Sequence, residues 1–181
     1  MKGALAPVMT KPNRNAVPNN IAASSRTFFV TTKTHQGKTL LQPERNAMLL
    51  IDVLRTCVTR RKFQVHDFVV MPNHVHILLT VDCSISIERA VQLIKGGFSY
   101  RLRKELSYTG EVWQRGFSEV RINTQKHYDA CRAYIAQNPV DAGLATAPEL
   151  YPFRFASPTQ KKQGLKPLDK EHLNGTAEAV P

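Results

Sequence analysis

Two strand-like segments joined by a two-residue turn constrain the fold of this chain most strongly. Residues 63–71 (FQVHDFVVM) and 74–81 (HVHILLTV) are rich in β-branched, aromatic and other apolar residues, and Pro72-Asn73 separates them. Pro and Asn are typical turn residues, so the sequence predicts an antiparallel β-hairpin. Successive side chains of a strand point to opposite faces, so His74 and His76 share one face and the apolar residues share the other. One face of this strand is therefore expected to join the core.

The flanking residues predict helices and strands that complete a sheet. Residues 26–34 (RTFFVTTKT), 111–117 (EVWQRGF) and 118–122 (SEVRI) have extended character. Apolar residues recur at helical spacing over 43–62, 86–106 and 124–137. Pro43 is expected in the first helical turn, Ser86 and Thr124 at helix starts, and Asn138-Pro139 at the end of the last helix. The order β-α-β-β-α-β-α predicts an α+β fold, with helices packed on an antiparallel sheet.

The 181 residues are expected to form one domain over residues 26–155. Residues 1–25 and 156–181 lack periodicity, so we expect a flexible basic N-terminal arm and a flexible C-terminal tail. Apolar runs are too short for a membrane span, and the first residues lack the apolar stretch of a secretory signal. The three cysteines form no CxxC pair. These features predict a cytoplasmic protein without disulfides.

Positive charge points to a polyanionic partner. The chain has 25 Lys and Arg residues against 14 Asp and Glu, which gives a formal net charge of +11. Nucleic acid is the commonest partner of such a chain, whereas the alternative is a soluble basic protein with no such partner. The residues that we expect to contact DNA phosphates are Lys95, Arg101, Arg103, Arg115 and Arg121.

His74 and His76 are candidate metal ligands because two imidazoles on one strand face can converge on one ion. The alternative is two polar side chains on the solvated face of a strand. A third ligand is available on the last helix, where Tyr134 and Asn138 are four residues apart and so share a face. An Asn carbonyl oxygen suits Mg²⁺ or Mn²⁺, and a nearby Tyr can attack a phosphate. The alternative is an ordinary half-buried Tyr134 and an Asn138 that caps the helix before Pro139.

The combination of motifs resembles the REP-associated tyrosine transposases. The segments that carry the resemblance are VVMPNHVHILLT, IKGGFSYRLRKEL, VWQRGFSEVRI and YIAQNPVDAGLA followed by YPF, over about residues 26–155. These transposases belong to the single-tyrosine, insertion-sequence 200-like branch of the His-hydrophobic-His (HUH) endonucleases. The resemblance implies a ferredoxin-like antiparallel sheet, with the HUH motif on a central strand and the nucleophile on a C-terminal helix.

The resemblance also implies roles for individual residues. His74, His76 and Asn138 match the metal ligands, with Mg²⁺ or Mn²⁺ as the cofactor, and Tyr134 matches the nucleophile. It implies cleavage and rejoining of single-stranded DNA beside palindromic hairpins, through a 5′-phosphotyrosine. Tyr128, six residues before Tyr134, is expected to face away from the metal. The implied location is cytoplasmic and nucleoid-associated, and the implied unit is a monomer or a homodimer.

One position departs from the family pattern. Many members have His at the third position of the segment SEV, where this chain has Val120. Val120 favours an alternative function, which is a hairpin-DNA-binding protein of the same family that has lost cleavage activity. A third reading, an RNA-binding module on a ferredoxin-like sheet, is disfavoured because no strand carries the aromatic-rich RNP1 pattern.

Overall fold

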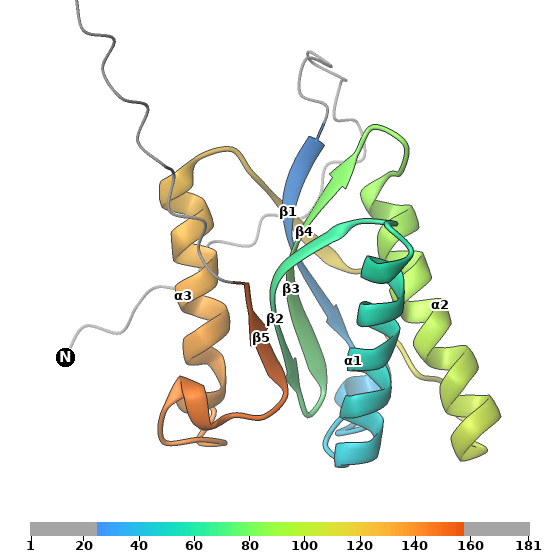
Figure 1. Cartoon of the computed structure of the whole chain (residues 1–181). Coiled ribbons are helices and arrows are strands. Elements are labelled where there is room, and N and C mark those ends of the chain that lie inside the picture. The colour runs from blue at the N-terminus through green and yellow to red at the C-terminus, as the bar shows by residue number, and fades with distance from the viewer. Residues whose placement is uncertain (1–24, 158–181) are drawn as a thin grey trace, which may run out of the picture.

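The computed structural model describes residues 25–157, which form one sheet with helices on both of its faces (Figure 1). The elements are β1 (Ser25–Lys33), α1 (Glu44–Thr59), β2 (Gln64–Met71), β3 (His74–Asp82), α2 (Ile87–Leu106), β4 (Ser118–Ile122), α3 (Gln125–Asp141) and β5 (Arg154–Ala156). Two short 3₁₀ helices, His35–Gly37 and Pro148–Leu150, lie in the connections. The predicted arm and tail lie outside the described residues, except for Ser25 in β1, Ala156 in β5 and the following Ser157.

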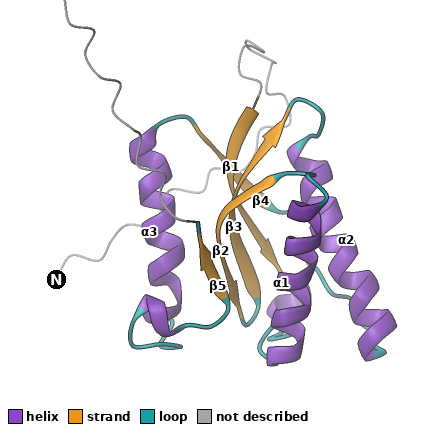
Figure 2. Cartoon of the chain, in the orientation of Figure 1, coloured by secondary structure: helices purple, strands orange, loops and turns teal. Residues whose placement is uncertain are grey.

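The sheet is antiparallel, with the strand order β4-β1-β3-β2-β5. The first four strands, with α1 and α2 on one face, have the ferredoxin-like arrangement that the resemblance implies. Helix α3 covers the opposite face (Figure 2). The predicted α+β class is therefore confirmed, and the hairpin of β2 and β3 turns at Pro72-Asn73 as expected. The edge strand β5, which pairs with β2, was not predicted because three residues give no readable alternation.

Two apolar clusters hold the helices on the sheet. Val75, Ile77 and Leu79 of β3 are at most 1% exposed and pack in the cluster beneath α1 and α2. On the other face, Leu78 of β3 and Ile135 of α3 belong to a smaller cluster. The alternation predicted for β3 is thus present, although its histidine face is also covered by a helix. No helix of residues 25–157 is long and apolar enough to cross a membrane.

The predicted end of the third helix is wrong. Helix α3 runs through Pro139 to Asp141, because the buried Pro139 ring packs in the last turn, where only one backbone hydrogen bond is lost. The helix ends before Gly143, which has a φ of +67°, and the Leu144 N–H donates to the Pro139 carbonyl at 2.8 Å. Asn138 is therefore not the helix cap, and its side chain is available to the sheet.

The other helix starts follow the sequence closely. The Ser86 and Thr124 side chains accept hydrogen bonds from the N–H groups of Arg89 and His127, as expected of N-cap residues. The prediction that Pro43 lies in the first turn of α1 is wrong, because Pro43 has an extended conformation and precedes that turn. Cys57, Cys83 and Cys131 are all free thiols.

Candidate active site

Strand β3 places two imidazoles side by side on the face that α3 covers. The ring centroids of His74 and His76 are 4.8 Å apart, and the rings are inclined by 77°. His76 is buried, with 4% of its surface exposed, whereas His74 is half-buried. In the pairing of β1 with β3, Lys33 lies opposite His74 and Thr31 lies opposite His76. Two strands therefore contribute to the surroundings of the histidines.

The ring of His76 has one nitrogen in use and one without a partner. Nδ1 lies 2.8 Å from Oγ1 of Thr31, while Nε2 is buried and has no hydrogen-bond partner among the described residues. Burial lowers the pKa of His76 to about 3, and the nearby charges of His74 and Lys33 act in the same direction. At neutral pH the ring is therefore uncharged, and one of its nitrogens carries a lone pair. A buried nitrogen of this kind is suited to a cation.

His74 is oriented by two asparagines. Its Nδ1 is 2.7 Å from Oδ1 of Asn73, the second residue of the hairpin turn, and its side chain also hydrogen-bonds with Asn138 of α3. Burial is the largest cause that lowers the pKa of His74, Lys33 lowers it further, and Asn138 opposes the shift. Asn138 therefore reaches the histidine pair from the opposite element.

Tyr134 lies one helical turn before Asn138 and contacts His76. Its ring centroid is 5.2 Å from that of His76 at an interplanar angle of 72°, and 5.9 Å from that of Phe29. Tyr128 lies elsewhere, since its ring is 5.5 Å from that of His66. The helix thus presents Tyr134 and Asn138 on one face, as their spacing predicts, and turns Tyr128 toward another part of the sheet.

The donors that converge here are two imidazoles and an amide. Residues 25–157 contain no cluster of three or more His, Cys, Asp or Glu side chains that suits a metal. The side chain that approaches His74 from α3 is the neutral amide of Asn138, which stays the predicted third donor. Such a set leaves the charge of a bound cation largely uncompensated by the protein, so a negatively charged ligand is favoured beside it.

Comparisons with known proteins identify the family of this chain. Residues 24–138 match the protein family described as "Transposase IS200 like", which is more than half of the chain. The chain belongs to the IS200-like transposase family. This family member is also similar to a solved REP-associated tyrosine transposase bound to a REP hairpin. That pair has 25% sequence identity and a TM-score of 0.59, over 81% of this chain and 82% of the other.

A second similar structure is that of a transposase from Deinococcus radiodurans R1 described as putative. It has 20% identity and a TM-score of 0.49, over 70% of this chain and 95% of that one. No curated protein matches this family member. The predicted resemblance to REP-associated tyrosine transposases is confirmed, and membership of the transposase family supports a DNA-cleaving enzyme in general terms.

A buried ion pair holds α3 on the sheet. Nε of Arg132 is 2.7 Å from Oδ2 of Asp67 on β2, and Asp67 is 2% exposed. Arg132 also donates to the backbone carbonyl of Ser157 at 2.7 Å. Burial raises the pKa of Asp67, although the charge of Arg132 opposes the shift. Arg132 is two residues before Tyr134, so the pair helps to set the position of the helix that carries Tyr134.

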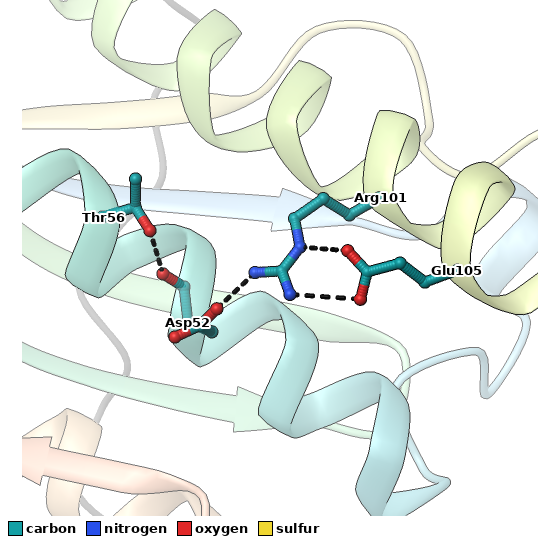
Figure 3. Close-up of polar contacts among 4 residues, drawn as sticks. All are labelled: Asp52, Thr56, Arg101 and Glu105. Carbon is teal, nitrogen blue, oxygen red and sulfur yellow. Dashed lines mark hydrogen bonds and ion pairs between the residues drawn. The ribbon is translucent and has the colours of Figure 1, made fainter.

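Arg101 and Lys95 of α2 have partners within the protein. Arg101 forms ion pairs with Asp52 of α1 and with Glu105, the latter at 2.6 Å between Nε and Oε1 (Figure 3). Lys95 donates from Nζ to the carbonyls of Gln114 and Gly116, both at 2.8 Å. The contact of Lys95 with DNA stays a prediction, and so does that of Arg101, although the ion pairs of Arg101 compete with it.

The remaining three predicted DNA contacts are exposed. Arg103 and Arg115 line one hollow of about 660 Å³, together with Trp113 and Glu111. Arg121 pairs with Phe28 across β4 and β1, which puts it on the face of the sheet that α1 and α2 cover. The five basic residues therefore do not form one continuous patch beside His74 and His76.

Several neighbours of the site were not found from the sequence. Thr31, Lys33 and Asn73 were missed because each gains its place from strand pairing or from the hairpin turn. Val120, the departure from the family pattern, lies opposite Phe29 on the face that α3 covers. A histidine at position 120, as in many family members, would therefore lie on the same face of the sheet as His74 and His76.

Proposed function

We propose that this chain cleaves and rejoins single-stranded DNA beside palindromic hairpins, with Tyr134 as the nucleophile. The observation that carries the proposal is the meeting of four side chains within one chain, those of Tyr134, Asn138, His74 and His76. Nε2 of His76 lies among them and has no hydrogen-bond partner in the part of the chain that the structure describes. Membership of the IS200-like transposase family supports it. Because one chain supplies all four side chains, a monomer is sufficient, and a homodimer is equally compatible.

The donor set fits a divalent cation. His74, His76 and Asn138 would hold Mg²⁺ or Mn²⁺ through two imidazole nitrogens and an amide oxygen. Thr31 supports this assignment, because an Nδ1–H of His76 that donates to Oγ1 leaves the Nε2 lone pair for the ion. A bound ion would supply Lewis-acid stabilisation of charge on a non-bridging phosphate oxygen.

Tyr134 would supply the attacking oxygen. Its Oη forms a bond to phosphorus as the bond from phosphorus to the 3′ oxygen of the preceding nucleotide breaks. The phenol gives up its proton, the 3′ oxygen gains one, and the products are a 5′-phosphotyrosine and a free 3′-OH. The adduct is itself a phosphodiester, so a second 3′-OH can reverse the step and rejoin a strand without another energy source.

DNA is the proposed partner on two grounds. The similar REP-associated tyrosine transposase was solved with a REP hairpin, and this chain is 25% identical to it. The net charge of +11 also favours a polyanion. We extend the proposal to a cytoplasmic, nucleoid-associated location, where such DNA is found.

A second candidate function is hairpin binding without cleavage. Val120 favours it, because an apolar side chain stands where many family members carry His, on the same face of the sheet as His74 and His76. A valine cannot donate a hydrogen bond or transfer a proton. The two functions differ in whether a covalent protein–DNA product forms.

The deciding experiment uses Tyr134→Phe, with Tyr128→Phe as the matched control. Wild-type protein is incubated with labelled hairpin oligonucleotides that carry single-stranded extensions, in Mg²⁺ or Mn²⁺, and resolved by denaturing electrophoresis. We expect a covalent band with the wild type and with Tyr128→Phe, and none with Tyr134→Phe. Hairpin binding should survive in all three, because only one oxygen atom is removed.

Two results would overturn these assignments. A band that persists in Tyr134→Phe and disappears in Tyr128→Phe would show that the wrong tyrosine was chosen. Tight binding of the wild type to hairpins, without a covalent band in either metal, would favour the binding-only function.

A further inference from the structure

A hollow of about 250 Å³ lies beside the histidine pair and has no part in the chemistry described above. Its lining residues are Thr31, Lys33, Gln114, Arg115, Gly116, Phe117 and Ser118. Two cations, two hydroxyls and an amide line it, and no carboxylate does. The larger neighbouring hollow differs, since it contains Glu111, which is paired with His35. The smaller hollow is therefore suited to an anion.

Strand register places the hollow close to the proposed site. Lys33 lies opposite His74, Thr31 lies opposite His76, and Ser118 lies opposite Thr31 on the next strand. Neighbouring strands are about 4.8 Å apart, so Ser118 is roughly 10 Å from His76 along this row. The charge of Lys33 acts on both imidazoles, which supports its place beside them. The hollow is thus beside the position of an attacked phosphate without coinciding with it.

The segment that presents Arg115 is fixed on both sides. The Gln114 N–H donates to the Lys33 carbonyl at 2.9 Å, and Lys95 holds the carbonyls of Gln114 and Gly116. Gly116 has a φ of +72°, a conformation that side-chain-bearing residues rarely adopt. Arg115 is therefore held next to Lys33 by a preorganised turn, while its own side chain is exposed.

We propose that this hollow binds a phosphodiester of the DNA strand next to the one that Tyr134 attacks, through Lys33 and Arg115. The proposal rests on the proposed function. It adds Lys33 as a positioning residue and assigns Arg115, which we already expect to contact DNA, to one particular phosphate. Thr31 has a part in both sites. If its Oγ1 accepts from His76 Nδ1, its hydroxyl proton is left to donate to another acceptor. Holding an adjacent phosphate would fix the strand in register with Tyr134.

The test measures binding of single-stranded DNA in the Tyr134→Phe background, so that cleavage does not interfere. Each phosphate contact contributes about 0.7 to the slope of log K against log salt for single strands. We expect Lys33→Gln and Arg115→Gln each to lower the slope by about that amount. Lys38→Gln is the matched control, since Lys38 is exposed and does not line the hollow. It should change the slope little.

A second measurement locates the phosphate. Each phosphodiester of the oligonucleotide is replaced in turn by a neutral methylphosphonate. Replacement at one position adjacent to the cleaved linkage should weaken binding of the oligonucleotide to the Tyr134→Phe protein. The same replacement should have no effect on a protein that also carries Lys33→Gln and Arg115→Gln. An unchanged salt slope in both variants, or an equal loss in Lys38→Gln, would overturn the proposal. If the hollow fails this test but the wild type still forms the covalent adduct, the proposed function of Tyr134 stands. If the slope falls as expected but the wild type forms no adduct, the phosphate site stands and only the proposed cleavage is refuted.

Discussion

At the scale of single residues, the hydroxyl of Thr31 controls which nitrogen of His76 is available. The neutral ring has one N–H and one lone pair, and Oγ1 of Thr31 lies 2.8 Å from Nδ1. If Nδ1 donates to Oγ1, the lone pair is on Nε2, which is buried and has no hydrogen-bond partner among residues 25–157. Outer hydrogen bonds of this kind orient metal-bound histidines and raise their basicity.

Replacing Thr31 by Val should therefore weaken the binding of Mn²⁺ without removing a ligand. We expect a loss of about 10- to 100-fold in affinity, measured by electron paramagnetic resonance of free Mn²⁺. Thr32→Val is the matched control, because Thr32 is also buried but faces the other side of the sheet, where its Oγ1 has no partner within the described part of the chain. This variant should bind Mn²⁺ as tightly as the wild type. Equal affinity in Thr31→Val would remove Thr31 from the site.

The histidines could be predicted from the sequence, whereas their partners could not. His74 and His76 share a face because strand alternation is local, and that prediction holds. Thr31 is 45 residues from His76 in sequence, and the two meet only through the register of β1 and β3. Register follows from how whole apolar faces fit together, which a single segment does not encode.

At the scale of elements, the position of α3 depends on a buried ion pair. Asp67 is 2% exposed and its carboxylate is paired with Arg132 of the helix. Removing one partner of such a pair leaves a charge in the interior, which costs about 3–5 kcal/mol of unfolding free energy. Replacing both partners by apolar or neutral groups of similar size costs far less.

Arg132→Ala should lower the free energy of unfolding by about that amount, as measured by urea denaturation. The double variant Asp67→Asn with Arg132→Met should recover most of the loss. Arg89→Ala, which removes an exposed Arg of α2, is the control and should change stability little. If Arg132→Ala and Arg89→Ala are equally stable, the ion pair does not hold the helix.

The cysteines offer an independent measure of α3. Burial raises the pKa of Cys131 to about 11 and also raises that of Cys57, so both are thiols at pH 8, whereas Cys83 is exposed. Thiolate is the reactive form. A Cys83→Ser variant should therefore react with maleimide hardly at all when folded and at two positions in urea. Fast labelling of Cys131 in the folded variant would mean that α3 opens readily.

The end of α3 shows where local rules reach their limit. The residue before a Pro disfavours the helical conformation, which predicts a stop at Asn138. In the fold, the Pro139 ring is buried and the helix continues to Asp141. Burial of the ring is a tertiary effect. It removes the alternative in which Asn138 caps the helix, and it leaves the Asn138 side chain in contact with His74.

At the scale of the whole molecule, the two faces of the sheet differ in chemistry. The face under α1 and α2 holds the larger apolar cluster, and the face under α3 holds the histidines and Tyr134. The element order and the ferredoxin-like arrangement follow from periodicity and resemblance. The path of DNA over the surface cannot be predicted in this way, because the sequence does not show which way a charged side chain points or whether another side chain of the protein pairs with it. Arg101 and Arg103, two residues apart on α2, illustrate the difficulty.

These two arginines should respond differently to replacement by Ala. Arg101 lies between Asp52 and Glu105, which raise the pKa of its guanidinium further and satisfy its charge within the protein (Figure 3). Arg101→Ala should lower the unfolding free energy by less than about 1 kcal/mol, as exposed ion pairs do, and leave DNA binding nearly unchanged.

Arg103 is exposed and lines the hollow that contains Arg115. Arg103→Ala should keep the stability of the wild type and lower the slope of log K against log salt by about 0.7 for single strands or 0.9 for duplex DNA. Both variants are measured by urea denaturation and by titration of a fluorescent hairpin oligonucleotide at several salt concentrations. If Arg101→Ala lowers the slope and Arg103→Ala does not, the ion pairs with Asp52 and Glu105 give way to DNA. The strand would then run along the α1 side of α2.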